Sequence, residues 1–203
     1  MANDDLTRPH IFRPGNDHTL LLLHGTGADE YDLVRLGQAL DPAAALLSPR
    51  GMYVEAGMNR FFERYPDGRF NEDSVRQAVT ELAGFLKAAQ AEYGFSFETL
   101  TAVGFSNGAN TAAAMLLITP DLLNQAVLFG STQPIMEFEE QPDLSGKRLF
   151  IANGDQDPYA PNLVTEDWVE ILRGFGAEVN WLRHPGGHQI SPAHLQKISS
   201  ELI

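Results

Sequence analysis

The pentapeptide Gly-Phe-Ser-Asn-Gly at residues 104–108 constrains the fold of this chain more than any other feature. A short apolar run at 101–103 precedes it, and an alanine-rich stretch of helical character follows at 110–117. In this setting the pattern Gly-x-Ser-x-Gly predicts a strand, a sharp strained turn with Ser106 at its apex, and a helix. The two glycines leave out a Cβ where the backbones of strand and helix crowd together. The alternative interpretation is an ordinary glycine-rich turn with a surface serine.

Apolar runs and helical patterns alternate along the rest of the chain. The run at 19–23 is apolar throughout, which is typical of a strand buried on both faces. Apolar residues recur every three or four positions over 72–93, which predicts the longest helix. Further strands are expected at 44–47, 100–104, 125–129, 148–152 and 178–182, and further helices at 32–40, 166–173 and from Pro192, capped by Ser191. This alternation predicts one α/β domain over residues 1–203, with a mostly parallel sheet and helices on both faces.

Composition excludes several classes of function. The chain has 203 residues and a formal net charge of −13, so nucleic acids and anionic membrane surfaces are poor partners. It contains no cysteine, which excludes disulfides, thiolate nucleophiles and cysteine-bound zinc. The N-terminus lacks an apolar signal core, and no apolar run approaches membrane-spanning length. A soluble, cytoplasmic protein is therefore expected.

A serine hydroxyl is a weak nucleophile at neutral pH, so Ser106 would need a base and an acid that orients the base. In a parallel sheet such side chains follow the carboxyl ends of the strands, in the chain order serine, acid, histidine. The favoured acid is Asp157, because it lies a few loop residues past the strand at 148–152 and Pro158 stiffens the chain after it. Asp155 is the rival, with an Asx-type turn as its alternative role.

The favoured base is His188, which follows the last expected strand in a loop with two glycines before it. His184 lies nearer the strand and is interpreted as a packed or solvent-facing ring. His194 falls within the final helix, where a surface position is the simplest interpretation. His10 and His18 lie in the N-terminal arm and the approach to the first expected strand, with no sign of a role.

An oxyanion would need two converging N–H donors. The backbone N–H of Asn107, directly after the serine, is expected to be one of them. Thr26, in the turn after the run at 19–23, is expected to supply the other. His24 in the same turn is expected to brace it through hydrogen bonds.

Rival chemistries lack their signatures. The segment at 25–27 has no third glycine at dinucleotide-binding spacing, and no Walker pattern or His-Glu-x-x-His spacing occurs. No cofactor and no metal ion are therefore expected.

Four segments together resemble the phospholipase/carboxylesterase branch of the α/β-hydrolases: residues 20–27, 104–108, 154–161 and 187–188. Within that branch, 29–33 and 60–64 look most like the bacterial hydrolases of catechol and hydroquinone stress. The resemblance implies an α/β-hydrolase fold without a large cap domain and a carboxylic ester hydrolase. The family pattern Gly-x-x-Asp-x-x-Val-Pro maps onto Asp157 and supports it over Asp155, although Ala160 replaces the usual valine.

The resemblance also implies that the connection after the second strand lines the substrate pocket. Its apolar walls are expected to come from Met58, Phe61, Phe62 and Tyr65. The alternative is that these side chains only pack beneath a long loop.

The function expected from these features is a serine carboxylesterase that hydrolyses small carboxylic esters through a Ser-His-Asp triad and an acyl-enzyme. A thioesterase or lysophospholipase would use the same machinery. Two further alternatives are a stress protein that binds quinone-type aromatic molecules, with incidental hydrolysis, and a domain whose serine turn is vestigial. The resemblance leaves a homodimer open, and no surface pattern argues for one.

Overall fold

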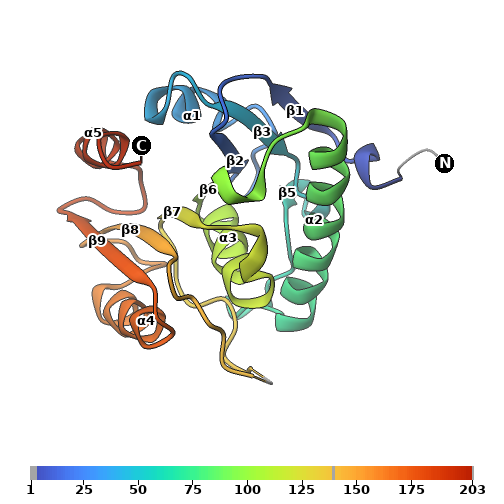
Figure 1. Cartoon of the computed structure of the whole chain (residues 1–203). Coiled ribbons are helices and arrows are strands. Elements are labelled where there is room, and N and C mark those ends of the chain that lie inside the picture. The colour runs from blue at the N-terminus through green and yellow to red at the C-terminus, as the bar shows by residue number, and fades with distance from the viewer. Residues whose placement is uncertain (1–3, 139, 203) are drawn as a thin grey trace.

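The structure, a computed structural model, describes residues 4–138 and 140–202. Within these residues a seven-stranded sheet has the order β1-β3-β2-β6-β7-β8-β9 (Figure 1). Six of its strands run parallel, and only the edge strand β1 is antiparallel, to β3. The strands are β1 (His10–Arg13), β2 (Thr19–Leu23), β3 (Ala45–Pro49), β6 (Leu100–Phe105), β7 (Gln125–Phe129), β8 (Arg148–Gly154) and β9 (Glu178–His184). The predicted mostly parallel sheet is confirmed.

Helices cover both faces of the sheet, as predicted (Figure 1). On one face α2 (Glu72–Tyr93), α3 (Asn107–Ile118) and α4 (Asn162–Gly174) enclose the larger apolar core. On the other face α1 (Val34–Leu40) and α5 (Pro192–Ser199) enclose the smaller one. All five residues of β2 are buried because the strand lies between the two cores.

The longest helix, α2, begins and ends where the sequence predicts. Its first turn carries two acidic residues, and the side chain of the N-cap Asn71 accepts a hydrogen bond from Ser74 N. Gly94 ends the helix with φ 76°, a left-handed conformation that glycine adopts without steric cost. These local signals explain why its boundaries follow from the sequence.

The structure differs from the predicted elements at several boundaries. Helix α1 begins two residues later and α4 four residues earlier than expected, while β8 and β9 each run two residues further. The edge strand β1 was not predicted, and its partly exposed side chains give no buried-strand pattern. Short 3-10 turns occupy Asp4–Thr7, Phe97–Thr99 and Pro120–Leu122.

The long connection at 48–71 contains a two-stranded hairpin, formed by β4 (Tyr53–Glu55) and β5 (Met58–Arg60). It carries no large cap, in agreement with the expectation for this fold. No helix among residues 4–138 and 140–202 is both long and apolar enough to cross a membrane.

Candidate active site

Ser106 occupies a strained turn between β6 and α3. Its backbone has φ 53° and ψ −114°, a left-handed region that residues with a Cβ rarely adopt. A Cβ on Gly108 would overlap the Leu23 carbonyl, and one on Gly104 would lie 2.5 Å from Ala109 N. The predicted strand–turn–helix geometry, with glycines where the backbones crowd, is therefore confirmed. The strain keeps the Ser106 side chain at the carboxyl edge of the sheet.

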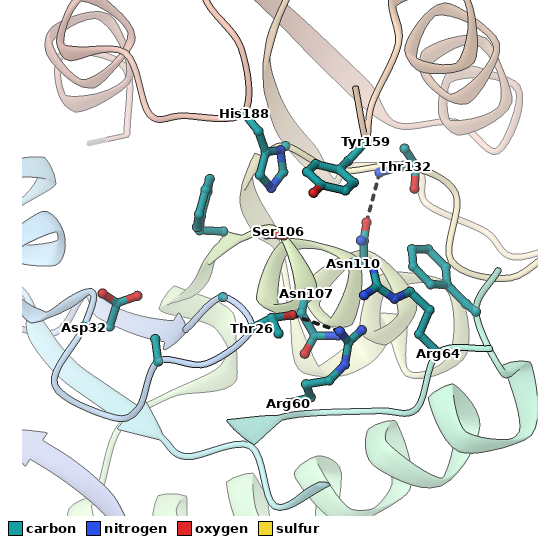
Figure 2. A pocket seen from close by; sticks show the side chains of 15 residues that line it. Thr26, Asp32, Arg60, Arg64, Ser106, Asn107, Asn110, Thr132, Tyr159 and His188 are labelled. Carbon is teal, nitrogen blue, oxygen red and sulfur yellow. Dashed lines mark hydrogen bonds between the residues drawn. The ribbon is translucent and has the colours of Figure 1, made fainter. Parts of the chain in front are cut away.

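A cavity of about 490 Å³ opens at this edge, and both Ser106 and His188 line it (Figure 2). Its walls come from segments far apart in the chain, each lying near the carboxyl end of a parallel strand or in the long connection at 48–71. Concave sites at this position are typical of open α/β sheets.

Asp157 and His188 are joined in this region by a 2.7 Å hydrogen bond between Oδ2 and Nδ1. The other carboxylate oxygen of Asp157 accepts hydrogen bonds from the backbone N–H groups of Tyr159 at 2.8 Å and Ala160 at 3.1 Å. The Asp157 side chain is only 1% exposed. A carboxylate fixed by backbone donors on one oxygen presents the other to the imidazole in a single orientation.

Three neighbours hold the His188 ring. Phe105 and Tyr159 each lie with their ring centroids 5.0 Å from it, on β6 and on the loop after β8. Gly130 lies so close that a Cβ there would stand 2.6 Å from His188 Cε1. Because Nδ1 is bound to Asp157, Nε2 remains for the cavity, and Figure 2 shows the ring lying over Ser106. Among the residues described, no hydrogen bond yet joins Ser106 to His188, a common feature of sites without substrate.

Asp155 takes a different part in the structure. It is exposed and forms an ion pair with Arg183, with 2.7 Å between Oδ1 and Nε. Its expected alternative role in an Asx-type turn is wrong, because Asp157 makes those backbone hydrogen bonds instead. The loop after β8 turns Asp155 outward, away from the cavity lining.

The two other histidines near the C-terminus are buried together. His184, for which a packed and a solvent-facing ring were both open, is packed and lies 5.2 Å from the ring of His194. The expected surface position of His194 is wrong, since it is 7% exposed and its Nε2 is bonded to the Arg183 carbonyl. Burial lowers the pKa of His194. The side of α5 that carries His194 packs against the end of β9. The spacing of apolar residues in the sequence did not reveal this contact.

The two expected oxyanion donors, Thr26 and Asn107, both line the cavity. Throughout the described part of the chain, no protein group accepts a hydrogen bond from either backbone N–H. The side chain of Asn107 faces another way, and its Oδ1 accepts from Phe61 N at 2.8 Å. In the described residues both backbone N–H groups are therefore without a protein acceptor.

His24 braces the turn that carries Thr26, as predicted. Its Nε2 accepts from Gly51 N at 2.9 Å, so the proton lies on Nδ1 and is donated to the Gly25 carbonyl at 2.7 Å. Burial lowers the pKa of His24, which favours this neutral form.

The expected apolar pocket walls need correction. None of the four residues lines the cavity: Met58, Phe61, Phe62 and Tyr65. Phe61 and Phe62 lie in the larger core, because the Phe61 backbone is tied to Asn107 and the Phe62 ring packs edge-on against Phe70. Met58 and Tyr65 are exposed.

Arginines occupy the wall in their place. Arg60 and Arg64 line the cavity from the long connection at 48–71, and Phe70, Asn110 and Tyr159 line it nearby. Sequence reasoning missed these residues, although both arginines lie in the 60–64 segment that carried part of the resemblance. The available signal was a group of charged residues mixed with aromatic ones at 60–65.

Comparison with known proteins identifies the family. Residues 10–202 match the sequence profile of the Phospholipase/Carboxylesterase family. MhqD of Bacillus subtilis, named as a hydrolase, is 40% identical over 183 residues, covering 90% of this chain and 91% of that protein.

Solved structures agree with this assignment. The Bacillus cereus carboxylesterase has a TM-score of 0.93 and 35% identity, covering 100% of this chain and 98% of its own. A carboxylesterase of Mesorhizobium loti has a TM-score of 0.87 and 30% identity, over 98% and 95% of the two chains. The chain therefore belongs to the phospholipase/carboxylesterase family of α/β-hydrolases and is a carboxylic ester hydrolase.

Proposed function

We propose that the protein hydrolyses small carboxylic esters through a triad of Ser106, His188 and Asp157 and a covalent acyl-enzyme. One observation carries this proposal: the buried Asp157 binds His188 Nδ1 at 2.7 Å, and His188 shares a cavity with Ser106. Nucleophile, base and orienting acid are the three groups that such chemistry needs.

In the first half-reaction, His188 Nε2 takes the proton of the Ser106 hydroxyl while that oxygen attacks the ester carbonyl carbon. Asp157 keeps a proton on Nδ1, so that Nε2 is free to accept, and it stabilises the imidazolium that forms. The backbone N–H groups of Thr26 and Asn107 donate hydrogen bonds to the developing oxyanion. The imidazolium then protonates the departing alcohol, and the acyl group stays on Ser106.

In the second half-reaction, water replaces the alcohol. His188 takes a proton from the water as it attacks the acyl carbon, and returns the proton to Ser106 as the acid leaves. The strained Ser106 backbone and the ring contacts to His188 support this proposal, because they fix both reacting groups before substrate binds.

Labelling with a fluorophosphonate tests the proposal directly. Intact-protein mass spectrometry should find one probe per chain, peptide mapping should find it on Ser106, and Ser106→Ala should take up none. Turnover of p-nitrophenyl acetate should fall by about six orders of magnitude in Ser106→Ala, because triad members act as a unit. Labelling elsewhere, or most of the esterase activity surviving in Ser106→Ala, would refute the mechanism.

A further inference from the structure

Two guanidinium groups enter the same cavity as Ser106. Arg60 is the last residue of β5, and its side chain is only 3% exposed. Arg64 lies four residues later and is half-buried. Figure 2 shows the two side chains turned toward each other on one side of the cavity. Burial lowers the pKa of Arg60, and the charge of Arg64 lowers it further. Two positive charges close together in a partly buried cavity wall favour the binding of an anion between them.

The existing partners do not balance this charge. Arg60 donates to the Phe62 carbonyl and to Thr26 Oγ1, both at 3.1 Å, and lies 3.5 Å from the partly exposed carboxylate of Glu55. In the described residues Arg64 has no ion pair with any acidic side chain. Within residues 4–138 and 140–202, the negative charge of Glu55 offsets one of the two positive charges, and the other has no acidic partner.

The other charged groups of the cavity lie elsewhere. Asp32 lines the wall, but Figure 2 shows it on the far side, across the turn that carries Thr26. His188 lies on the opposite side of Ser106 from both arginines. One unbalanced positive charge matches a single carboxylate better than a doubly charged phosphate.

The position of His188 indicates which part of a substrate reaches the arginines. The leaving alcohol must lie against His188 to receive its proton. The acyl group then extends away from His188, across the oxyanion donors, toward the side where Arg60 and Arg64 lie. An anion bound there belongs to the acyl part of the ester.

We propose that Arg60 and Arg64 form a carboxylate subsite, and that the preferred substrates are monoesters of short dicarboxylic acids. This proposal rests on the proposed function, since Ser106 must attack the ester for the acyl group to be oriented. Guanidinium groups pair with carboxylates through two parallel hydrogen bonds, which would also fix the acyl chain in the cavity.

The experiment compares two esters of equal length. Monoethyl glutarate carries the carboxylate, and its carbamoyl analogue, ethyl 4-carbamoylbutanoate, replaces that group with a neutral amide. The wild type should hydrolyse the acid ester with a kcat/KM about ten- to a hundredfold higher, the effect of one charge-assisted pair. Arg64→Gln should bring the ratio of the two close to one, mainly through KM. Monoethyl succinate and adipate would then define the preferred length.

Arg69→Gln is the matched control. Arg69 is an arginine of the same connection, but its side chain is 78% exposed and paired with Asp67 outside the cavity lining. Its substitution should leave the ratio unchanged. Arg64 is chosen over Arg60 for the main test, because loss of Arg60 would also remove its bonds to the Phe62 carbonyl and Thr26.

A binding measurement tests the carboxylate subsite independently of ester hydrolysis. Calorimetry should detect free glutarate binding to the wild type and to Ser106→Ala, with binding lost in Arg64→Gln. If both esters are hydrolysed with equal kcat/KM and glutarate does not bind, the carboxylate subsite is refuted while the proposed function stands. Glutarate binding in a protein that cleaves neither ester would instead refute the proposed function. Binding of inorganic phosphate but not glutarate would overturn the assignment of a carboxylate.

Discussion

Asp157→Asn isolates the contribution of one carboxylate oxygen. The asparagine oxygen can still accept from the Tyr159 and Ala160 N–H groups, so the loop should keep its shape. Its amide nitrogen then faces His188 Nδ1 across the present 2.7 Å. Since that nitrogen donates, the imidazole must give up its Nδ1 proton and carry one on Nε2 instead. An imidazole protonated at Nε2 cannot take the Ser106 proton.

The expected loss in kcat is about 10⁴-fold, equivalent to about 5.5 kcal/mol of transition-state stabilisation. Steady-state hydrolysis of p-nitrophenyl acetate measures it, with Ser106→Ala prepared in parallel to reveal contaminating esterase. Asp155→Asn is the matched control. It removes only the exposed ion pair with Arg183, so activity should stay within about twofold. If Asp155→Asn is the more damaging change, or Asp157→Asn keeps about a tenth of wild-type kcat, Asp157 is not the residue that orients His188.

Three further changes test the packing around the site. Gly130→Ala should lower kcat by about tenfold or more with little change in KM, because a Cβ would displace the His188 ring; unchanged kinetics would contradict that contact. Phe62→Ala should lower the free energy of unfolding in urea by about 3–5 kcal/mol, and its acyl-chain preference should stay as in the wild type. A shifted preference would return Phe62 to the pocket wall. Because the pKa of His24 is lowered in the folded chain, the unfolded chain binds more protons than the folded chain below pH ~6.5. The free energy of unfolding should therefore fall as the pH drops below about 6.5. The slope from this residue is at most about 1.4 kcal/mol per pH unit, and His24→Asn should reduce it in urea titrations between about pH 5 and 7.

The parts of the fold that the sequence predicts are those fixed by short-range patterns. The apolar run of β2 and the helical period of α2 each determine their element locally, so their boundaries agree with the structure. The turn around Ser106 is likewise set by its own glycines and its neighbours. The positions of Asp157 and His188 followed from topology, since side chains past the ends of parallel strands meet at one edge.

What escaped prediction depends on contacts between distant segments. Whether Phe61 or Arg60 faces the cavity is decided by the bond from Phe61 N to Asn107 and by the bond from Arg60 to Thr26. Neither can be read from the order of residues in an irregular loop. His194 is buried for a similar reason, because its helix packs against a histidine ten residues earlier, at the end of β9.

The unpredicted β4–β5 hairpin contacts the turn that carries Thr26, one of the two proposed oxyanion donors. Asn59 accepts from Gly27 N at 2.9 Å and donates its side-chain amide to the Ala28 carbonyl at 2.9 Å, while Arg60 donates to Thr26 Oγ1. Three consecutive residues of the turn after β2 are thus held by two consecutive residues of the hairpin. Because Arg60 also lines the cavity, we expect a carboxylate bound to it to tighten the contacts that hold the turn carrying Thr26. If Thr26 is an oxyanion donor as proposed, binding energy from the remote end of the acyl chain would help to hold a group that stabilises the transition state. Such energy raises kcat and not only affinity.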